Sequence, residues 1–390
     1  MISPGIEQFV RNPPPSMQGR KLALLCNQSS TDHLLHHSRD LVNRVFPDGL
    51  TCLFSPQHGF FSEKQDNMVE SGHGRDPFSG LPVYSLYADK RKPDPAMFES
   101  FDILLIDLAD VGTRVYTFIW TVVYCLQTAA ETGKRVVILD RPNPIGGHLV
   151  EGNLLKKEWR SFVGLYEIPM RHGMTIGELA LLCNREMHIN ARIEVIPVQG
   201  WRRRMFFHEN GFPWVYPSPN MPSPVSALVY PGQVIWEGTN FSEGRGTTLP
   251  FELCGAPYVQ PLQVLKYLDK IHLPGCVFRP VAFEPTSGKW AGRTCSGFHI
   301  HVTDCHSFRP YRTSLALLQA VLTLYPDDFA YKEPPYEYEF TRMPIDLILG
   351  DREMRLSLEA GADIEELERS WQEDLAQFID RRNSVLLYDE

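Results

Sequence analysis

Several features that define whole classes of protein are missing from this sequence. No stretch approaches the roughly 18 consecutive apolar residues that a membrane-spanning helix needs. Acidic residues outnumber basic ones, 47 against 38, so the chain carries no basic field that would attract nucleic acid or anionic lipid. The sequence therefore predicts a soluble protein that acts on a small molecule or an oligosaccharide, with no nucleic-acid partner and no membrane partner.

The cysteines and the N-terminus show no sign of export. None of the eight cysteines belongs to a Cys-x-x-Cys pair, and several lie in apolar runs, which favours buried free thiols. Residues 1–7 lack a cationic segment followed by an apolar stretch. We expect a cytoplasmic protein from the sequence as written, and a periplasmic or secreted one if the start is trimmed from a longer precursor. The oligomeric state is left open.

Signatures of nucleotide and metal binding are also missing. Residues 27–30, Asn-Gln-Ser-Ser, stand where a glycine-rich dinucleotide loop would follow the first strand, and no phosphate-binding loop occurs elsewhere. His36 and His37 are adjacent and would face apart on a helix, and the pair His299 and His301 has no acidic or cysteine partner nearby. We therefore expect no cofactor and no metal.

The apolar pattern predicts an α/β fold. A chain of 390 residues with 43% apolar content is long enough for two domains. Its first part alternates short, continuous apolar runs, typical of strands buried on both faces, with helix-length segments at 34–45 and 116–132. The four runs are residues 21–27, 50–54, 102–108 and 135–140. This alternation predicts a parallel sheet covered by helices, with ligands bound beyond the carboxyl ends of the strands.

The second part of the chain mixes helices and strands. Thr175, followed by Glu178 three residues later, predicts a capping box that opens a helix. Strands are expected at 192–197, 277–283 and 298–302, and helices at 313–324 and 364–381. The last of these is amphipathic and is expected to pack through Leu367, Trp371, Leu375 and Phe378.

Polar loops after the N-terminal strands are the first candidates for a site. His58 follows the second strand, and Asp110, Arg114 and Tyr116 follow the third. Two prolines after the fourth strand hold Asn143 outward. A structural interpretation stays open for each loop: a lone histidine is often structural, Asp110 can cap the next helix or pair with Arg114, and the Asn143 loop can be a simple turn.

The second part adds a further set of polar loops. Arg171 and His172 precede a helix N-terminus, a place that favours anionic groups, although His172 can equally hold its loop together. Asn220 lies in the segment Pro-Ser-Pro-Asn-Met-Pro. Residues 237–248 combine acids, an arginine and hydrogen-bonding side chains with glycines that permit close approach of the backbone to a ligand. The ligand-binding candidates in this last segment are Asn240, Ser242, Glu243 and Arg245.

Six of these segments, read in order, resemble one known family. They are Ser-Pro-Gln-His-Gly-Phe, Asp-Val-Gly-Thr-Arg-x-Tyr-Thr, Asp-Arg-Pro-Asn-Pro, Arg-His-Gly-Met-Thr-x-Gly-Glu, Pro-Ser-Pro-Asn-Met-Pro and Glu-Gly-Thr-Asn-x-Ser-Glu-Gly-Arg-Gly-Thr-Thr. The chain, from about residue 21 to residue 388, is similar to the NamZ-type exo-β-N-acetylmuramidases, glycoside hydrolase family 171. The resemblance implies a Rossmann-like N-terminal domain, residues 1–160, a smaller α/β domain, residues 161–390, and a cleft between them.

The resemblance also implies an activity, which is release of N-acetylmuramic acid from the non-reducing ends of peptidoglycan fragments in cell wall recycling. The lactyl carboxylate of that sugar needs a cation, for which Arg171, Arg245 and Arg114 are candidates. The acetamido group suits amide and hydroxyl partners. Those candidates are Asn143, Asn220, Asn240 and Ser242. His172 is a further substrate-binding candidate, and the catalytic candidates are Gln57, His58, Asp110, Tyr116 and Glu243.

The sequence departs from the family at Gln57, where many members carry glutamate. An amide does not exchange a proton near neutral pH, so Gln57 cannot act as acid or base. Three alternatives stay open. Another acid serves, with Glu243, Asp110, Glu63 and Asp66 as candidates; the acetamido group of the substrate acts as nucleophile; or the protein binds a sugar or muropeptide without cleaving it.

Overall fold

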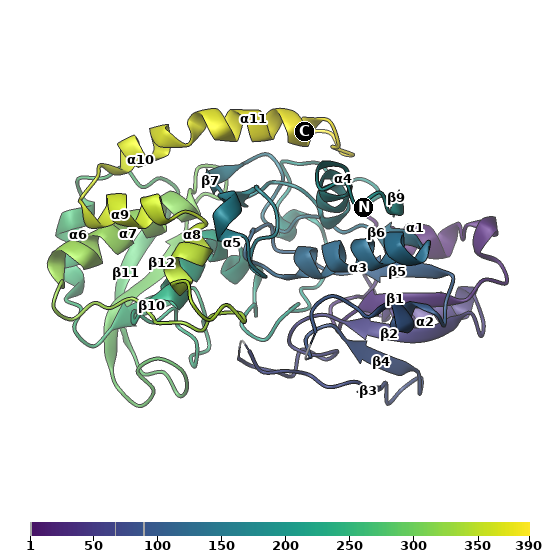
Figure 1. The fold of residues 1–390 in the computed structure, drawn as a ribbon. Coiled ribbons are helices and arrows are strands. Elements are labelled where there is room, and N and C mark those ends of the chain that lie inside the picture. The colour runs from purple at the N-terminus through teal and green to yellow at the C-terminus, as the bar shows by residue number, and fades with distance from the viewer. Residues whose placement is uncertain (1, 67, 89) are drawn as a thin grey trace.

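A seven-stranded sheet forms the N-terminal part of the molecule (Figure 1). The structure is a computed structural model that describes residues 2–66, 68–88 and 90–390. The strand order is β3-β4-β2-β1-β5-β6-β9, and all pairs are parallel except β3 with β4. The strands are β1 (Leu22–Cys26), β2 (Leu50–Ser55), β3 (Gly74–Arg75), β4 (Pro82–Ser85), β5 (Ile103–Asp107), β6 (Arg135–Leu139) and β9 (Arg192–Ile196). The predicted α/β class and its four strands are confirmed.

Helices cover both faces of this sheet. Alternate residues of each strand point to opposite faces, so Leu22 and Leu24 of β1 pack with α1 (Gly5–Arg11) and α2 (Ser38–Val45). Ala23 belongs to the core on the other face, where α3 (Phe118–Thr132) and α4 (Ile176–Glu186) lie. Burial on both faces explains why the strands are continuous apolar runs. Strand β9 lies beyond residue 160 and still pairs with β6.

The second part contains an antiparallel sheet of order β10-β12-β11 and a two-stranded sheet of β7 and β8. Its strands are β7 (Glu151–Leu154), β8 (Pro169–Arg171), β10 (Leu253–Ala256), β11 (Cys276–Phe283) and β12 (Cys295–Val302). Its helices are α5 (Pro224–Gln233), α6 (Pro261–Leu268), α7 (Pro310–Leu324), α8 (Pro344–Leu349), α9 (Arg352–Glu359), α10 (Ile364–Ser370) and α11 (Gln372–Asn383). Short 3₁₀ helices are η1 (Pro15–Met17), η2 (Pro95–Phe98), η3 (Lys157–Trp159), η4 (Phe207–Glu209) and η5 (Val234–Gly238).

The C-terminal helices return the chain to the first part. In Figure 1, α10 and α11, drawn in yellow, run along one side of the molecule from the second part toward the N-terminal sheet. The tail then docks, because the Tyr388 hydroxyl donates to the Asp140 carboxylate at 2.5 Å and Arg203 N–H donates to the carbonyl of Asp389 at 2.9 Å. These hydrogen bonds of the C-terminal tail connect the two parts of the molecule in addition to the covalent chain.

Two predicted helices differ from those observed. The helix expected at 34–45 begins only at Ser38, because Leu35 has a left-handed φ of 66° and the His37 side chain caps the helix. The helix expected at 364–381 is broken at Trp371, next to Ser370, whose hydroxyl donates to the carbonyl of Leu367 at 2.7 Å and so competes with the helical bonds. The apolar stripe of that segment is buried as predicted.

Among the described residues, no helix is long and apolar enough to cross a membrane.

Candidate active site

A pocket of about 440 Å³ of space, counted to its open mouth, lies where loops of both parts meet. Its walls come from the loop after β2, the turn before α3, residues 218–221, helix α5, η5 and residues 336–337. The side chains that carry its chemistry are Gln57, His58, Tyr116, Glu237, Arg245 and Glu337. Below, this space is called the carboxylate pocket, because two glutamates line it.

The loop after β2 turns sharply to place His58 in this pocket. His58 has a left-handed φ of 74°, which is uncommon for a residue with a side chain. Its Nδ1 lies 2.8 Å from the carbonyl of Lys64, so the proton is assigned to Nδ1 and Nε2 is left as an acceptor. Burial lowers the pKa of His58 to about 4. The imidazole is therefore neutral near pH 7 and can accept a hydrogen bond from a sugar hydroxyl.

Gln57 holds the carboxyl group of Glu337. The Gln57 amide donates to Glu337 Oε1 at 2.9 Å and accepts from the Thr117 hydroxyl at 2.5 Å. The Tyr87 hydroxyl donates to Glu337 Oε2 at 2.6 Å. Burial raises the pKa of Glu337 against these two hydrogen bonds, and the nearby Glu237 carboxylate raises it further. Glu337 is thus the carboxyl group in this pocket most inclined to hold a proton.

Glu237 has the opposite electrostatic environment. Burial opposes its ionisation, but Arg245 and Tyr336 outweigh that effect and lower the pKa of Glu237. Arg245 Nη2 donates to Oε1 at 2.6 Å, and the Tyr336 hydroxyl donates to Oε2 at 2.7 Å. One pocket therefore holds a carboxyl group biased toward the acid form and another biased toward the carboxylate, which is how paired acids divide their roles in enzymes.

Tyr116 adds a hydroxyl that the protein leaves available. This hydroxyl is buried and lies near Ser218, and it makes no hydrogen bond of ordinary geometry to any residue that the structure describes. Burial raises the pKa of Tyr116, so the phenol stays neutral and keeps its proton. A buried hydroxyl in a pocket wall is stabilised when a ligand completes its hydrogen bond.

A cationic recess adjoins the carboxylate pocket and shares Glu237, Arg245 and Tyr336 with it. Lys289 lies there with all three donors engaged, by Glu243 Oε2 at 2.6 Å and by two backbone carbonyls. Lys332 also lines the recess, is exposed, and has no ion-pair partner in the part of the chain that the structure describes. The recess thus offers one cation that is not already neutralised.

Four of the predicted residues line the carboxylate pocket besides Gln57. They are His58, Tyr116, Asn220 and Arg245. Glu243 lines the adjoining cationic recess and lies 3.4 Å from Arg245 Nε. Of the acids considered as replacements for Gln57, Asp66 also lines the cationic recess. Glu63 instead lines a separate recess beside β4.

Arg114 and Arg171 lie outside the pocket, in the scaffold. The Arg114 guanidinium donates to four backbone carbonyls at 2.8–3.1 Å, two of them in α8. Arg171 donates to the carbonyl of Ile145. Burial lowers the pKa of each arginine to about 10, and both are 1% exposed or less. Their charges serve to bind the backbone of the two parts together.

Asn143, His172, Asn240 and Ser242 are held by the protein itself. The Asn143 amide bonds the carbonyl of Met174 and the N–H of Ile145, and Asn240 is bonded through both ends of its amide. His172 Nδ1 accepts from Met174 N–H, and its Nε2 lies 3.4 Å from Asp110 Oδ2. The Ser242 hydroxyl accepts from Gly244 N–H. Asp110 lines a different pocket, described below.

The sequence prediction missed Glu337. Its loop is marked in the sequence by the run Pro-Pro-Tyr-Glu-Tyr-Glu at 334–339, which joins stiff, aromatic and acidic residues. Glu337 and Tyr338 both have left-handed φ values, 45° and 67°, a strained conformation that is frequent at functional sites. Across residues 2–66, 68–88 and 90–390, no group of three or more His, Cys, Asp or Glu side chains is arranged to hold a metal ion.

Comparisons with known proteins agree with the resemblance found in the sequence. Two family models, described as exo-beta-N-acetylmuramidase NamZ, N-terminal and C-terminal, match residues 22–225 and 228–388. The peptidoglycan beta-N-acetylmuramidase NamZ of Bacillus subtilis strain 168 is 40% identical over 99% of this chain and 91% of its own. A crystal structure of a DUF1343 family protein from Bacteroides fragilis NCTC 9343 superposes with a TM-score of 0.89 at 31% identity, covering 100% of this chain and 99% of that one. A second DUF1343 structure from that strain has a TM-score of 0.78 at 28% identity, with the same coverage.

Proposed function

The chain belongs to the family of NamZ exo-β-N-acetylmuramidases, and from this premise we propose that it is a glycoside hydrolase that removes N-acetylmuramic acid from the non-reducing ends of peptidoglycan fragments. The observation that carries the proposal is the pair Glu337 and Glu237, two buried carboxyl groups in one pocket whose pKa values move in opposite directions. Glycoside hydrolysis uses such a pair.

Glu337 is the general acid in this proposal. Its proton passes to the glycosidic oxygen while the bond from that oxygen to the anomeric carbon breaks, and the bonding electrons stay with the oxygen. The leaving sugar then departs as an alcohol, and Glu337 is left as a carboxylate. The Gln57 amide and the Tyr87 hydroxyl, which already donate to its two oxygens, stabilise that charge. Gln57 therefore positions the acid, Glu337, and does not itself act as the acid.

Glu237 stabilises the positive charge that develops at the anomeric carbon. Both of its oxygens accept hydrogen bonds, from Arg245 and from Tyr336, which makes the carboxylate a poor nucleophile. The acetamido oxygen of the substrate forms the new bond to the anomeric carbon instead, as in substrate-assisted glycosidases. Water that gives a proton to the Glu337 carboxylate then attacks the anomeric carbon and breaks that bond, which releases N-acetylmuramic acid and restores the acid form of Glu337. An aryl muramide without the acetyl group is then expected not to turn over.

The cationic recess receives the lactyl carboxylate. Lys332 is the cation there that has no acidic partner among the described residues, and Arg245 borders both spaces. A charge-assisted hydrogen bond from the Lys332 ammonium to the lactyl carboxylate distinguishes N-acetylmuramic acid from sugars that lack the lactyl group.

The direct test is release of N-acetylmuramic acid, measured by chromatography, from the disaccharide in which it is β-linked to N-acetylglucosamine. Wild-type protein is expected to release it, and Glu337→Gln to lose about 10²–10⁴-fold of the rate. Glu333→Gln, an exposed acid on the same segment, is the matched control and is expected to keep the rate. No release by the wild type, or an undiminished rate in Glu337→Gln, contradicts the proposal.

A further inference from the structure

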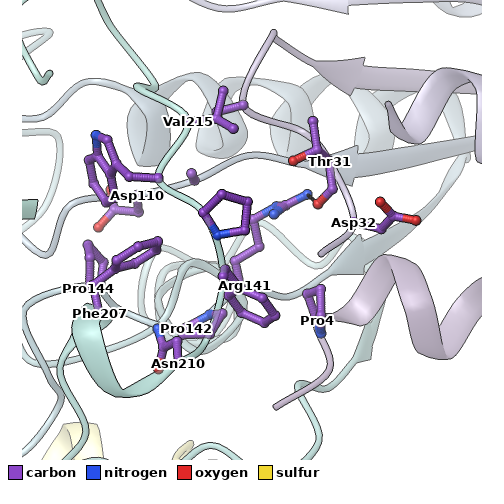
Figure 2. A pocket seen from close by; sticks show the side chains of 15 residues that line it. Pro4, Thr31, Asp32, Asp110, Arg141, Pro142, Pro144, Phe207, Asn210 and Val215 are labelled. Carbon is purple, nitrogen blue, oxygen red and sulfur yellow. Dashed lines mark hydrogen bonds between the residues drawn. The ribbon is translucent and has the colours of Figure 1, made fainter. Parts of the chain in front are cut away.

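A second pocket lies at the carboxyl edge of the N-terminal sheet (Figure 2). It has about 570 Å³ of space counted to its open mouth. Its walls come from the N-terminus and from the segments 29–32, 109–110, 141–144 and 207–215. We call it the sheet-edge pocket.

Two side chains in this pocket have polar atoms that no described residue satisfies. Asn210 is 3% exposed, and neither its amide nitrogen nor its amide oxygen has a hydrogen-bond partner. Asp110 is 6% exposed and uses only Oδ2, which accepts from Gly112 N–H at 2.7 Å, while Oδ1 is unpartnered. Buried polar groups nearly always have a hydrogen-bond partner. A ligand that offers hydrogen-bond donors to the two oxygens and an acceptor to the Asn210 amide nitrogen would complete the bonds of this wall.

The rest of the wall is apolar and rigid. The rings of Phe207 and Trp214 meet edge to face with centroids 4.7 Å apart, and the Trp214 indole N–H is fixed on the carbonyl of Met221 at 3.0 Å. Pro142 and Pro144 lie on the same side as Phe207 and Asn210 in Figure 2. An apolar face beside hydrogen-bonding groups is the complement of a pyranose ring, which has one apolar face and a polar edge.

The charges of the sheet-edge pocket favour an uncharged ligand. Its cation, Arg141, is already bonded through Nη2 to Asp107 Oδ2 at 2.8 Å and to the carbonyl of Thr31 at 2.9 Å. Asp110 and Asp32 also line the pocket and repel an anion. The cationic recess differs in one respect, because its Lys332 has no ion-pair partner among the described residues. An asymmetric substrate with its acidic sugar toward Lys332 and a neutral sugar toward Asn210 fits this difference.

The two pockets are lined by neighbouring stretches of one segment. Residues 213–215 line the sheet-edge pocket, and Ser218, Asn220 and Met221 line the carboxylate pocket. Asp110 lines the first, and its charge acts on Tyr116, which lines the second. The segment 213–221 and the pair Asp110 and Tyr116 therefore connect the walls of the two pockets.

We infer that the sheet-edge pocket binds the neutral saccharide unit that leaves when the glycosidic bond is cleaved, through Asn210, Asp110 and the Phe207–Trp214 pair. This inference rests on the proposed function for the identity of the leaving sugar. Asn210 is a specificity-determining residue in it, and an acetamido or hydroxyl pair on the ring is the group that completes its hydrogen bonds.

The test compares two substrates in the full-length protein with Asn210→Leu. One substrate carries N-acetylglucosamine as leaving group and the other carries an aryl group, which offers no donor to Asn210. Loss of two hydrogen bonds is expected to lower the ratio of kcat/KM, disaccharide over aryl glycoside, by about tenfold or more. Because the Asn210 side chain has no protein partner, the Tm is expected to stay level or rise.

Asn184→Leu is the matched control. The Asn184 amide bonds both the carbonyl and the N–H of Ala191 and lines neither pocket, so this variant is expected to lower the Tm and leave the ratio of kcat/KM unchanged. A ratio in Asn210→Leu equal to that of the wild type overturns the inference. If the wild type cleaves neither substrate, the proposed function fails, and saturation-transfer NMR with N-acetylglucosamine decides the inference alone. Binding to the wild type that is lost in Asn210→Leu supports it, and absence of binding overturns it.

Discussion

Gln57→Glu is the substitution that probes the assigned acid most sharply. The variant places a second carboxyl group where the Gln57 amide now lies, 2.9 Å from Glu337 Oε1. Two unit charges at that separation repel by about 6 kcal/mol at an effective dielectric constant near 20. Two carboxyl groups so close share one proton, and known dyads separate their two apparent pKa values by about 3 units. The pair is therefore expected to keep its proton to higher pH than Glu337 does alone.

The sign of the effect follows from the role of Glu337. A general acid works only while protonated, so activity falls as pH rises through its pKa. Burial already raises that pKa in the wild type, and the new carboxylate raises it further. The alkaline limb of the kcat/KM profile is expected to move up by about 2–3 units. The acidic limb, which reports ionisation of Glu237, is expected to move far less because Arg245 and Tyr336 hold that carboxylate.

The assay is kcat/KM for an aryl β-N-acetylmuramide between pH 4 and pH 10. Gln28→Glu is the control, because it adds the same charge on a neighbouring loop, where the side chain contacts the carbonyl of Tyr216 instead of Glu337. An alkaline limb that stays in place in Gln57→Glu, or that moves equally in Gln28→Glu, would refute the assignment of Glu337 as the acid.

Three further predictions follow from the same contacts. Tyr116→Phe is expected to change the free energy of unfolding little, since the hydroxyl makes no hydrogen bond of ordinary geometry and has only Ser218 near it among the described residues, and to lower kcat/KM about tenfold; an unchanged kcat/KM contradicts its role in binding. Lys332→Met is expected to lower selectivity for the muramide over the matching N-acetylglucosaminide by about tenfold, and equal selectivity would show that the carboxylate is held elsewhere. Burial raises the pKa of Glu151 from 4.5 to about 7. The contribution of the protonated Glu151 to the stability of the fold is therefore fully present below pH 4.5 and is lost as the pH rises through about 7. Glu151→Gln is therefore expected to raise the free energy of unfolding by about 3 kcal/mol at pH 8 and by far less at pH 4, measured in urea, and an equal gain at both pH values contradicts the cause given.

Local pattern was enough to predict seven strands, which are β1, β2, β5, β6, β9, β11 and β12, and the helices α3, α4 and α7. Strands β1, β2, β5 and β6 are short apolar runs because both faces of the sheet are covered, and that burial leaves a signal in neighbouring residues. The start of α2 was wrong by four residues because Leu34 and Leu35 are exposed, at 62% and 53%, and take no part in the helix. The sequence pattern alone does not distinguish an exposed leucine from a buried one.

The site was less predictable, because its parts meet through distant contacts. Glu337 lies 280 residues from Gln57, and only the tertiary fold brings the two side chains together. The role of Arg114 depends on carbonyls 234 and 235 residues away, in α8, and nothing near Arg114 in sequence marks them. The motif loops could be predicted to carry chemistry, whereas which charges face a ligand and which bind the backbone is decided by packing.

The most direct test of the account is the dependence of Glu337→Gln on the leaving group. A missing general acid matters most when the leaving oxygen is strongly basic, as in a sugar, and least for a dinitrophenyl group, which departs without protonation. Glu337→Gln is therefore expected to lose about 10²–10⁴-fold in kcat on the disaccharide and roughly tenfold or less on the dinitrophenyl muramide. Equal losses on the two substrates would contradict the assignment of Glu337 as the proton donor.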